Sequence, residues 1–352
     1  MTNVRMSVQS ESGWSSLPER ATDTADGFAW IAEGGTLKRM VKYSIAAIVL
    51  AAAAHAPGAQ LSTDARGAIP HDVQQLVVID YHAMQNSTSA MDLRNRVMPP
   101  ELKQFEEALT NSGLNENHDV DELAFALYRV SPGGDDLQTV GIAQGQFDTQ
   151  SILANFQKQK LKATKVRTNS IYPMTKTGMM LCFVDPSTMV FGGRDAVTKA
   201  LDVRDGIAAS MLTNGPMMNA MQSVDSNPLW SILDAKGTQT VMHQLLGEAG
   251  SVTDFDTVKK HLEASWYGMD FQHGVSFNLT IDTGDSFAAA TVSSLLTAAV
   301  MVRKMSASDT EKQALAATDI SSDSGKLTIH FTSSDSEFSA LLQSPLFQSM
   351  VK

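Results

Sequence analysis

The stretch from Leu137 to Asp205 decides the fold, because it divides into four pieces of contrasting pattern. LQTVGIAQGQF (137–147) is rich in strand-forming residues, and DTQSILANFQKQ (148–159) has apolar residues at helical spacing. MMLCFVDPSTMVFGG (179–193) predicts a hairpin, since Asp-Pro-Ser-Thr is a turn sequence. RDAVTKALDVRD (194–205) predicts a closing helix. Strands and helices in this order indicate an α+β fold.

The rest of the chain repeats this alternation of strands and helices. We expect two similar sheet-plus-helix units with antiparallel hairpins, 71–210 and 211–352, from a duplication of about 150 residues. The evidence is the order of elements, because Pro228–Leu233 resembles the strand at 76–80 and a hairpin and helix follow it. Further elements are predicted at a helix 101–113, a hairpin 263–271 and 275–281, a helix 286–305, a strand 326–331 and a helix 336–351.

The N-terminus has the pattern of an exported protein. Residues 1–39 are polar, and we interpret them as a leader from a start codon placed too far upstream. The basic run Lys38–Lys42 and the apolar YSIAAIVLAAAAHA predict a signal peptide over 40–59, followed by a linker over 60–70. The alternative is a cytoplasmic tail before a short anchor helix. The first interpretation predicts a periplasmic or secreted protein with no stable transmembrane anchor after cleavage.

Charge and cysteine usage restrict the partners. The chain has a formal net charge of −11, which disfavours nucleic acid as a partner. Cys182 is the one cysteine, so an intramolecular disulfide is excluded. Its apolar flanks predict a small buried hydrophobe, and a nucleophile is the alternative.

Four short motifs together resemble a loosely defined group of exported bacterial α+β proteins. The motifs are VDELAFALYRV (120–130), GQFDTQSILANF (145–156), MVFGGRDAVTKALD (189–202) and Pro228-Leu229-Trp230, with Ile171-Tyr172-Pro173 between them. The group shares a G-x-F-D junction between strand and helix, and a hairpin that ends in glycine and a helix. The group has no established activity, so the resemblance implies fold and export and carries over no site residues.

Motifs of common catalytic and cofactor sites are absent from the sequence. G-x-S-x-G, H-E-x-x-H, the P-loop pattern and G-x-G-x-x-G do not occur, so we predict no cofactor and no metal. The acidic run Asn115–Glu122 lacks the glycine and the terminal glutamate of a calcium loop, and we predict a solvated loop. Met217, Met218 and Met221 suggest either a Cu(I) site or, far more commonly, a methionine-rich core.

Two further segments have two interpretations each. The first is a basic run that comprises Lys158, Lys160, Lys162, Lys165 and Arg167. It could contact an anionic partner, or it could keep an edge of the sheet soluble. The helix SFAAATVSSLLTAAVMVRKM (286–305) is almost uncharged, but its serines and threonines shorten the apolar stretch. We therefore predict a buried core helix and not a membrane span.

These observations leave three hypotheses for function. The first is an exported, non-enzymatic binding or envelope-interaction module whose partner is a protein or another envelope component. The second is a hydrolase-type enzyme with scattered residues, for which Asp80, His82 and Tyr172 are the candidates. The third is a membrane-associated partner that uses the basic run. A cleft with converging polar groups would favour the second, and a broad apolar or basic face would favour the others.

Overall fold

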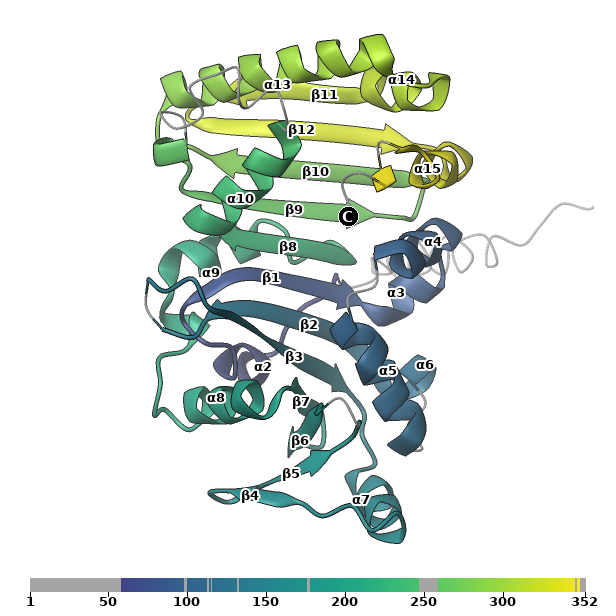
Figure 1. Cartoon of the computed structure of the whole chain (residues 1–352), viewed down its shortest axis with the longest axis vertical. Coiled ribbons are helices and arrows are strands. Elements are labelled where there is room, and N and C mark those ends of the chain that lie inside the picture. The colour runs from purple at the N-terminus through teal and green to yellow at the C-terminus, as the bar shows by residue number, and fades with distance from the viewer. Residues whose placement is uncertain are drawn as a thin grey trace, which may run out of the picture. The chain divides into compact units, whose positions relative to one another are not determined.

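A computed structural model describes residues 58–97, 100–112, 114, 116–131, 133–175, 178–246, 259–345 and 347–348. The polar leader and the predicted signal segment up to residue 57 lie outside these residues. The fold is α+β, with helices packed on a large antiparallel sheet (Figure 1). The sheet has twelve strands in the order β11-β12-β10-β9-β8-β1-β2-β3-β7-β6-β5-β4.

The first half of the sheet contains strands β1 to β7. These strands are β1 (Val73–Asp80), β2 (Val120–Arg129), β3 (Leu137–Gly145), β4 (Thr164–Val166), β5 (Asn169–Pro173), β6 (Met180–Asp185) and β7 (Thr188–Gly192). The helices of this part are α2 (Thr63–Gly67), α3 (Tyr81–Gln85), α4 (Thr88–Val97), α5 (Pro100–Ser112), α6 (Glu116–Asp119), α7 (Thr149–Lys158) and α8 (Arg194–Arg204).

The second half of the sheet contains strands β8 to β12. These strands are β8 (Leu229–Asp234), β9 (Ala264–Asp270), β10 (Val275–Asp282), β11 (Thr318–Asp323) and β12 (Lys326–Ser333). Its helices are η1 (Met211–Thr213), α9 (Gly215–Gln222), α10 (Ala235–Leu246), η2 (Lys259–His261), α13 (Ser286–Ser306), α14 (Asp309–Ala316) and α15 (Asp335–Leu342).

The two halves have the same strand order once the β4–β5 hairpin is set aside. The first reads β1-β2-β3-β7-β6 and the second β8-β9-β10-β12-β11, each with a helix after its third strand. The halves join through β1 and β8, which pair antiparallel with Leu76 opposite Ile232 and Val78 opposite Trp230. This order is compatible with the predicted duplication, which remains a proposal, as do its boundaries.

An aspartate caps the helix that follows each of four strands. Asp80 and Asp234 accept hydrogen bonds from backbone amides at 2.8 Å after β1 and β8. Asp148 does the same at 3.0 Å after β3, and Asp285 at 2.7 Å after β10. A carboxylate at this position satisfies an amide that has no partner within the helix.

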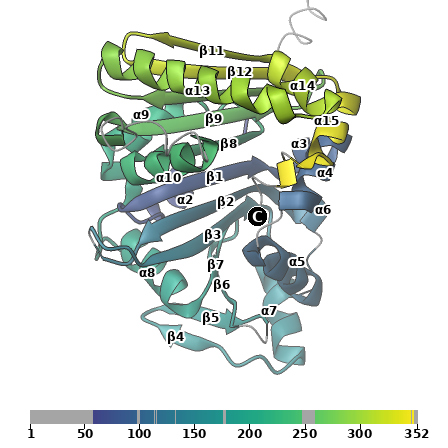
Figure 2. The ribbon, with the colours of Figure 1, turned by 45° about the horizontal axis from the view of Figure 1, so that its top comes forward.

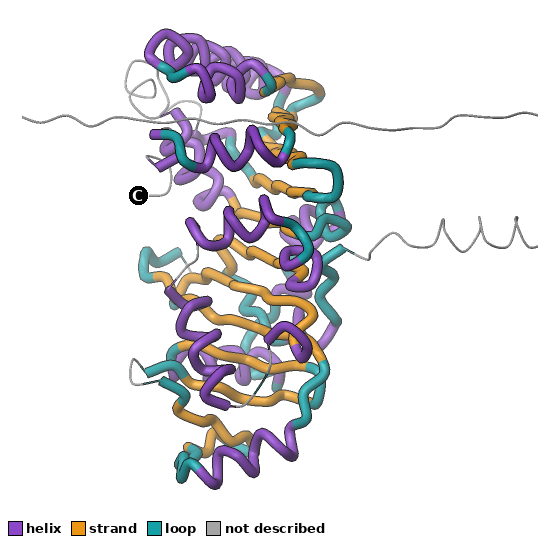
Figure 3. The backbone as a smooth tube through the Cα atoms, turned by 90° about the vertical axis from the view of Figure 1, so that its right-hand side faces the viewer, coloured by secondary structure: helices purple, strands orange, loops and turns teal. Residues whose placement is uncertain are grey.

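Helices cover the sheet on two faces (Figure 3). Face A is the side toward which Leu76, Val78 and Trp230 point, and α2, α8 and α9 pack on it. Face B is the opposite side, where α5 and α7 cover the first half and α10 and α13 cover the second. The first half therefore has two cores, one on each face. In the second half, β8 is buried on both faces, whereas the outer strands β10 and β12 bury mainly face B.

Strands β10 and β12 show this one-sided burial in their sequences. On face B, Leu279, Ile281 and Leu327 are buried. On face A, Asn278 and Thr332 are exposed. Strict alternation of apolar and polar residues is typical of a sheet with one face in water.

The predicted loose linker over 60–70 is wrong. It forms α2 and contributes Leu61, Ala65 and Ile69 to the core on face A. Ordered structure already begins before it, since Ala59 is fully buried and its carbonyl accepts a 2.7 Å hydrogen bond from the indole Nε1 of Trp230. Ala59, the predicted end of the signal peptide, therefore belongs to the folded core.

The predicted buried core helix over 286–305 is also wrong. α13 buries one side, through Ala288, Ala289, Val292 and Leu296, against β11 and β12. Its other side faces outward, where Phe287 is 84% exposed. Figure 2 shows α13 as an outer helix that runs along the last strands of the sheet. The uncharged sequence therefore does not reflect burial.

Other local predictions have mixed outcomes. Met217 and Met221 are buried in the core on face A, which confirms the core interpretation. Cys182 is buried as predicted, and burial raises the pKa of its thiol to about 11. The acidic run predicted as a loop forms α6 and leads directly into β2. α15 ends at Leu342, residues 345, 347 and 348 are helical again, and the predicted end at 351 lies outside the described residues.

Candidate functional site

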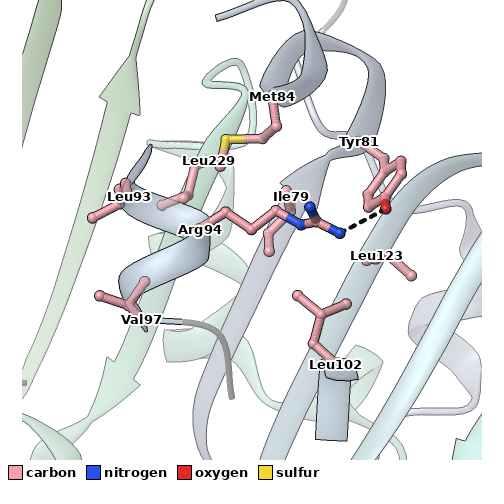
Figure 4. Close-up of a pocket in the computed structure, with 9 residues that line it drawn as sticks. All are labelled: Ile79, Tyr81, Met84, Leu93, Arg94, Val97, Leu102, Leu123 and Leu229. Carbon is pink, nitrogen blue, oxygen red and sulfur yellow. Dashed lines mark hydrogen bonds between the residues drawn. The ribbon is translucent and has the colours of Figure 1, made fainter. Parts of the chain in front are cut away.

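An apolar pocket lies on face B where β1 ends and the chain turns into α3 and α4 (Figure 4). The cavity has a volume of about 50 Å³. Its wall is almost entirely apolar, and it is formed by Ile79, Tyr81, Met84, Leu93, Arg94, Val97, Leu102, Leu123 and Leu229.

Local sequence explains how these side chains come together. Asp80 ends β1 and caps α3, so the chain turns at once and places Tyr81 and Met84 over the sheet. α4 then returns with Leu93 and Arg94 on the side that faces the pocket (Figure 4). β8 adds Leu229 from the second half of the sheet, because it pairs with β1. The pocket thus lies where the two halves meet.

Arg94 is the polar group of the pocket. Its side chain is 14% exposed, and it forms an ion pair with Glu106 and donates a 3.1 Å hydrogen bond to the Tyr81 hydroxyl. The guanidinium also lies 5.6 Å from the centre of the Tyr81 ring. Its Nε–H is buried, and among the described residues it has no hydrogen-bond partner. A buried donor of this kind favours any ligand that brings an acceptor.

The chemistry of this arrangement is that of binding. Glu106 neutralises the charge of Arg94, so the pocket does not require an anion. The apolar wall favours an apolar group, and the free Nε–H favours a neutral acceptor such as a carbonyl oxygen beside it. The volume is about a third of the ~150 Å³ cavity that holds benzene in an engineered protein, so the pocket suits one small side chain.

The fold brings together only two of the three candidate residues for a hydrolase site. Asp80 and His82 lie beside Asp121 and Glu122, and the His82 Nε2 is 3.0 Å from the Asp121 Oδ1. Tyr172 lies elsewhere, on β5, where its ring packs 4.9 Å from that of Phe156. The three residues therefore do not form one site.

Glu122 is the electrostatically unusual member of this acidic group. Burial raises the pKa of its carboxyl, and the negative charges of Asp121 and Asp80 raise it further. A hydrogen bond from the Gln144 Nε2, 2.9 Å from the Glu122 Oε2, opposes this shift. Within the described residues, no group of three or more His, Cys, Asp or Glu side chains has an arrangement that could hold a metal ion.

The basic run lies along an edge of the sheet. Lys158, Lys160, Lys162 and Lys165 are exposed around β4, which is the last strand in the sheet order. Arg167 is already engaged, with ion pairs to Asp202 at 2.5 Å and Asp205 at 2.9 Å. Any contact of this run with an anionic partner therefore depends on the four lysines.

Sequence reasoning did not find the pocket. Its residues come from six separate elements. Two of them, Leu123 and Leu229, lie in motifs quoted above, but those motifs indicate fold and not a site. Leu93 and Arg94 lie in a stretch that reads simply as polar. The sequence offered one indication of the pocket. Tyr81 and Met84 follow directly after a strand that ends in the capping residue Asp80.

Comparison with known proteins gives a likeness of fold. No family model matches the chain, and no curated protein matches it. The crystal structures of TP0453, a Treponema protein, are similar at 10% sequence identity. Crystal form I has a TM-score of 0.46 and covers 78% of this chain and 95% of that one. Crystal form III has a TM-score of 0.48 and covers 80% and 99%.

One described helix has the length and composition of a membrane span. α13 has 21 residues and a mean hydropathy of 1.4 over its most apolar window, of which 22% is buried. Core helices of soluble proteins can have the same length and hydropathy.

Proposed function

We propose that this protein is an exported, non-enzymatic binding module that accepts one apolar side chain of an extended peptide in the pocket beside Arg94. The observation that carries the proposal is an apolar cavity whose wall includes Arg94, with a buried Nε–H that has no hydrogen-bond partner among the described residues. An apolar side chain would fill the cavity, and a peptide carbonyl next to it would accept the hydrogen bond. The predicted signal peptide supports export of the protein.

Methyl NMR tests this directly. The probes are the peptides acetyl-Gly-X-Gly-amide, in which X is Gly, Ala, Val, Leu or Phe. We expect saturable shifts of the Met84 and Leu229 methyl signals with an apolar X, and none with Gly, because the cavity wall provides the binding energy. Equal responses to all peptides, or shifts confined to other methyl groups, would remove the pocket as a binding site.

A conservative variant tests the role of the guanidinium. Arg94→Lys keeps a positive charge beside Glu106 and removes the Nε–H donor. We expect binding of the best peptide to weaken roughly tenfold, the value of one hydrogen bond of about 1.4 kcal/mol. Arg96→Lys is the matched control, since Arg96 lies on the same helix and is exposed. Equal affinities of both variants would contradict the role of the Arg94 Nε–H.

A further inference from the structure

The outward side of α13 is a concentration of exposed apolar surface. Phe287 is 84% exposed, Met301 64%, Val302 59% and Met305 79%. These four are among only nine large hydrophobic side chains recorded as exposed in the described residues. Exposed apolar residues gathered on one helix are typical of an interaction surface.

Between these large residues, the outward side carries small ones. Ala290, Ser294 and Ala298 are exposed and continue the line from Phe287 to Met301 at helical spacing. The Ser294 hydroxyl donates a 2.9 Å hydrogen bond to the Ala290 carbonyl of its own helix. Its polarity is therefore satisfied, and the surface is well suited to contact with another apolar surface. We call this line of five residues the α13 stripe.

The α13 stripe is symmetric about Ser294. Phe287 and Met301 lie seven residues on either side, and Ala290 and Ala298 lie four residues on either side. If a second, antiparallel copy of α13 crosses at Ser294, each Phe287 meets the Met301 of the other copy, and each Ala290 meets an Ala298. Small residues at the crossing allow two helices to approach closely, and Phe–Met contacts are favourable.

The ends of α13 carry complementary charges. Asp282 and Asp285 lie at its N-terminal end, and the Asp285 side chain is 44% exposed. Arg303 and Lys304 lie at its C-terminal end. An antiparallel arrangement places the basic end of each helix near the acidic end of the other, and it also pairs the helix dipoles favourably. A parallel arrangement would bring like charges together.

We infer that the α13 stripe is the contact of a two-fold symmetric homodimer in which two α13 helices cross antiparallel at Ser294. Self-complementarity is the property that a two-fold interface requires, because the same surface must fit itself. A helix of this length spans about 30 Å, so the contact is small and the dissociation constant should be of micromolar order. This interface is separate from the proposed peptide pocket and does not depend on it.

Cysteine cross-linking tests the register. Ser294→Cys places a thiol on the symmetry axis, so oxidation of the purified protein should give a disulfide-linked dimer. Ser286→Cys is the matched control, since Ser286 is also exposed on α13 but the two copies would be about 24 Å apart. Buried Cys182 is present in both variants and does not distinguish them. Cross-linking of both variants, or of neither, would overturn the antiparallel register.

Sedimentation tests the surface. At tens of micromolar, the weight-average mass of the wild type should approach twice the chain mass, and Phe287→Glu should return it to one chain mass. Ile207→Glu is the control, because Ile207 is 63% exposed outside α13 and should leave the dimer intact. Thermal unfolding checks that both variants are folded. A monomeric wild type that co-sediments with phosphatidylcholine vesicles would overturn the dimer and assign the stripe to a membrane.

Discussion

The two halves of the sheet share a strand order but differ in how they are covered. In the first half, helices pack on both faces, and β7 is buried along its whole length. In the second half, β10 and β12 pack helices on face B, while residues such as Asn278 and Thr332 on face A are exposed. One topology thus supports two modes of burial, and the residue pattern of each strand decides which is used.

This difference in burial predicts which positions are sensitive to substitution. A strand covered on both faces has no tolerant side, whereas a strand covered on one face has one tolerant and one sensitive side. Equivalent substitutions in the two halves should therefore have different costs. Two pairs of substitutions test this directly, and two further experiments concern the junction of the halves and β2. The expected effects run from the largest to the smallest.

The largest contrast should come from two phenylalanines on topologically equivalent strands. Phe191 on β7 is 1% exposed, and its ring stacks 4.0 Å from that of Phe105. We expect Phe191→Ala to lower the free energy of unfolding by about 3–5 kcal/mol, because it leaves a cavity. Phe331→Ala on β12 should cost half of that or less, because Phe331 is only partly buried. Urea denaturation measures both, and equal losses would contradict the difference in burial between the two side chains.

The junction of the halves gives the second prediction. A chain that begins at Gln60 lacks the Ala59 carbonyl and leaves the buried Trp230 Nε1–H without its acceptor. We expect it to be about 1–3 kcal/mol less stable than a chain that begins at Gly58. Chemical denaturation of the two purified forms measures the difference. Equal stability would show that the N-terminal residues do not contribute to the core.

A pair of near-isosteric substitutions tests whether face A is buried in the first half and exposed in the second. Val190 on β7 is fully buried on this face, so Val190→Thr should cost about 1–3 kcal/mol by burying a hydroxyl. Thr328 on β12 is partly exposed on the same face, and Thr328→Val should change stability by less than about 0.5 kcal/mol. Thermal unfolding of the two variants is the measurement. A large loss from Thr328→Val would mean that face A of the second half is covered.

The smallest effect concerns Glu122 on β2. Burial raises its carboxyl pKa in the folded protein, so the folded state binds a proton more tightly than the unfolded state. Its contribution to stability is therefore greatest below the unfolded pKa and is lost as pH rises through the folded pKa. We expect Glu122→Gln to be more stabilising, relative to wild type, at pH 7 than at pH 4. A pH-independent difference between the two proteins would contradict this.

Much of the fold follows from the sequence because local signals coincide with tertiary structure. The hairpin 179–193 has both apolar strands and a turn sequence, and β6 and β7 form there. Asp148 predicts the start of α7 because capping needs only neighbouring residues. β10 and β12 also follow from their alternation.

Other features could not be predicted because they depend on distant partners. α13 has a composition that suits burial, but the sheet ends beside it and leaves one side uncovered. Ala59 reads as the end of a signal peptide because its partner, Trp230, is 171 residues away. The pocket likewise depends on the β1–β8 pairing, which brings Leu229 beside Tyr81. Periodicity carries no information on such contacts.

The pairing of β1 with β8 also affects the order of folding during synthesis. Synthesis proceeds from the N-terminus, so β1 and β2 are available long before residues 229–234. Until β8 arrives, β1 is an edge strand with unpaired backbone groups, and its sequence VQQLVVID is strongly strand-forming. This edge of β1 therefore stays unpaired for the time needed to add about 100 residues, between the end of β2 and the start of β8. An exposed strand edge of this kind can pair with another chain, so aggregation during synthesis is a risk.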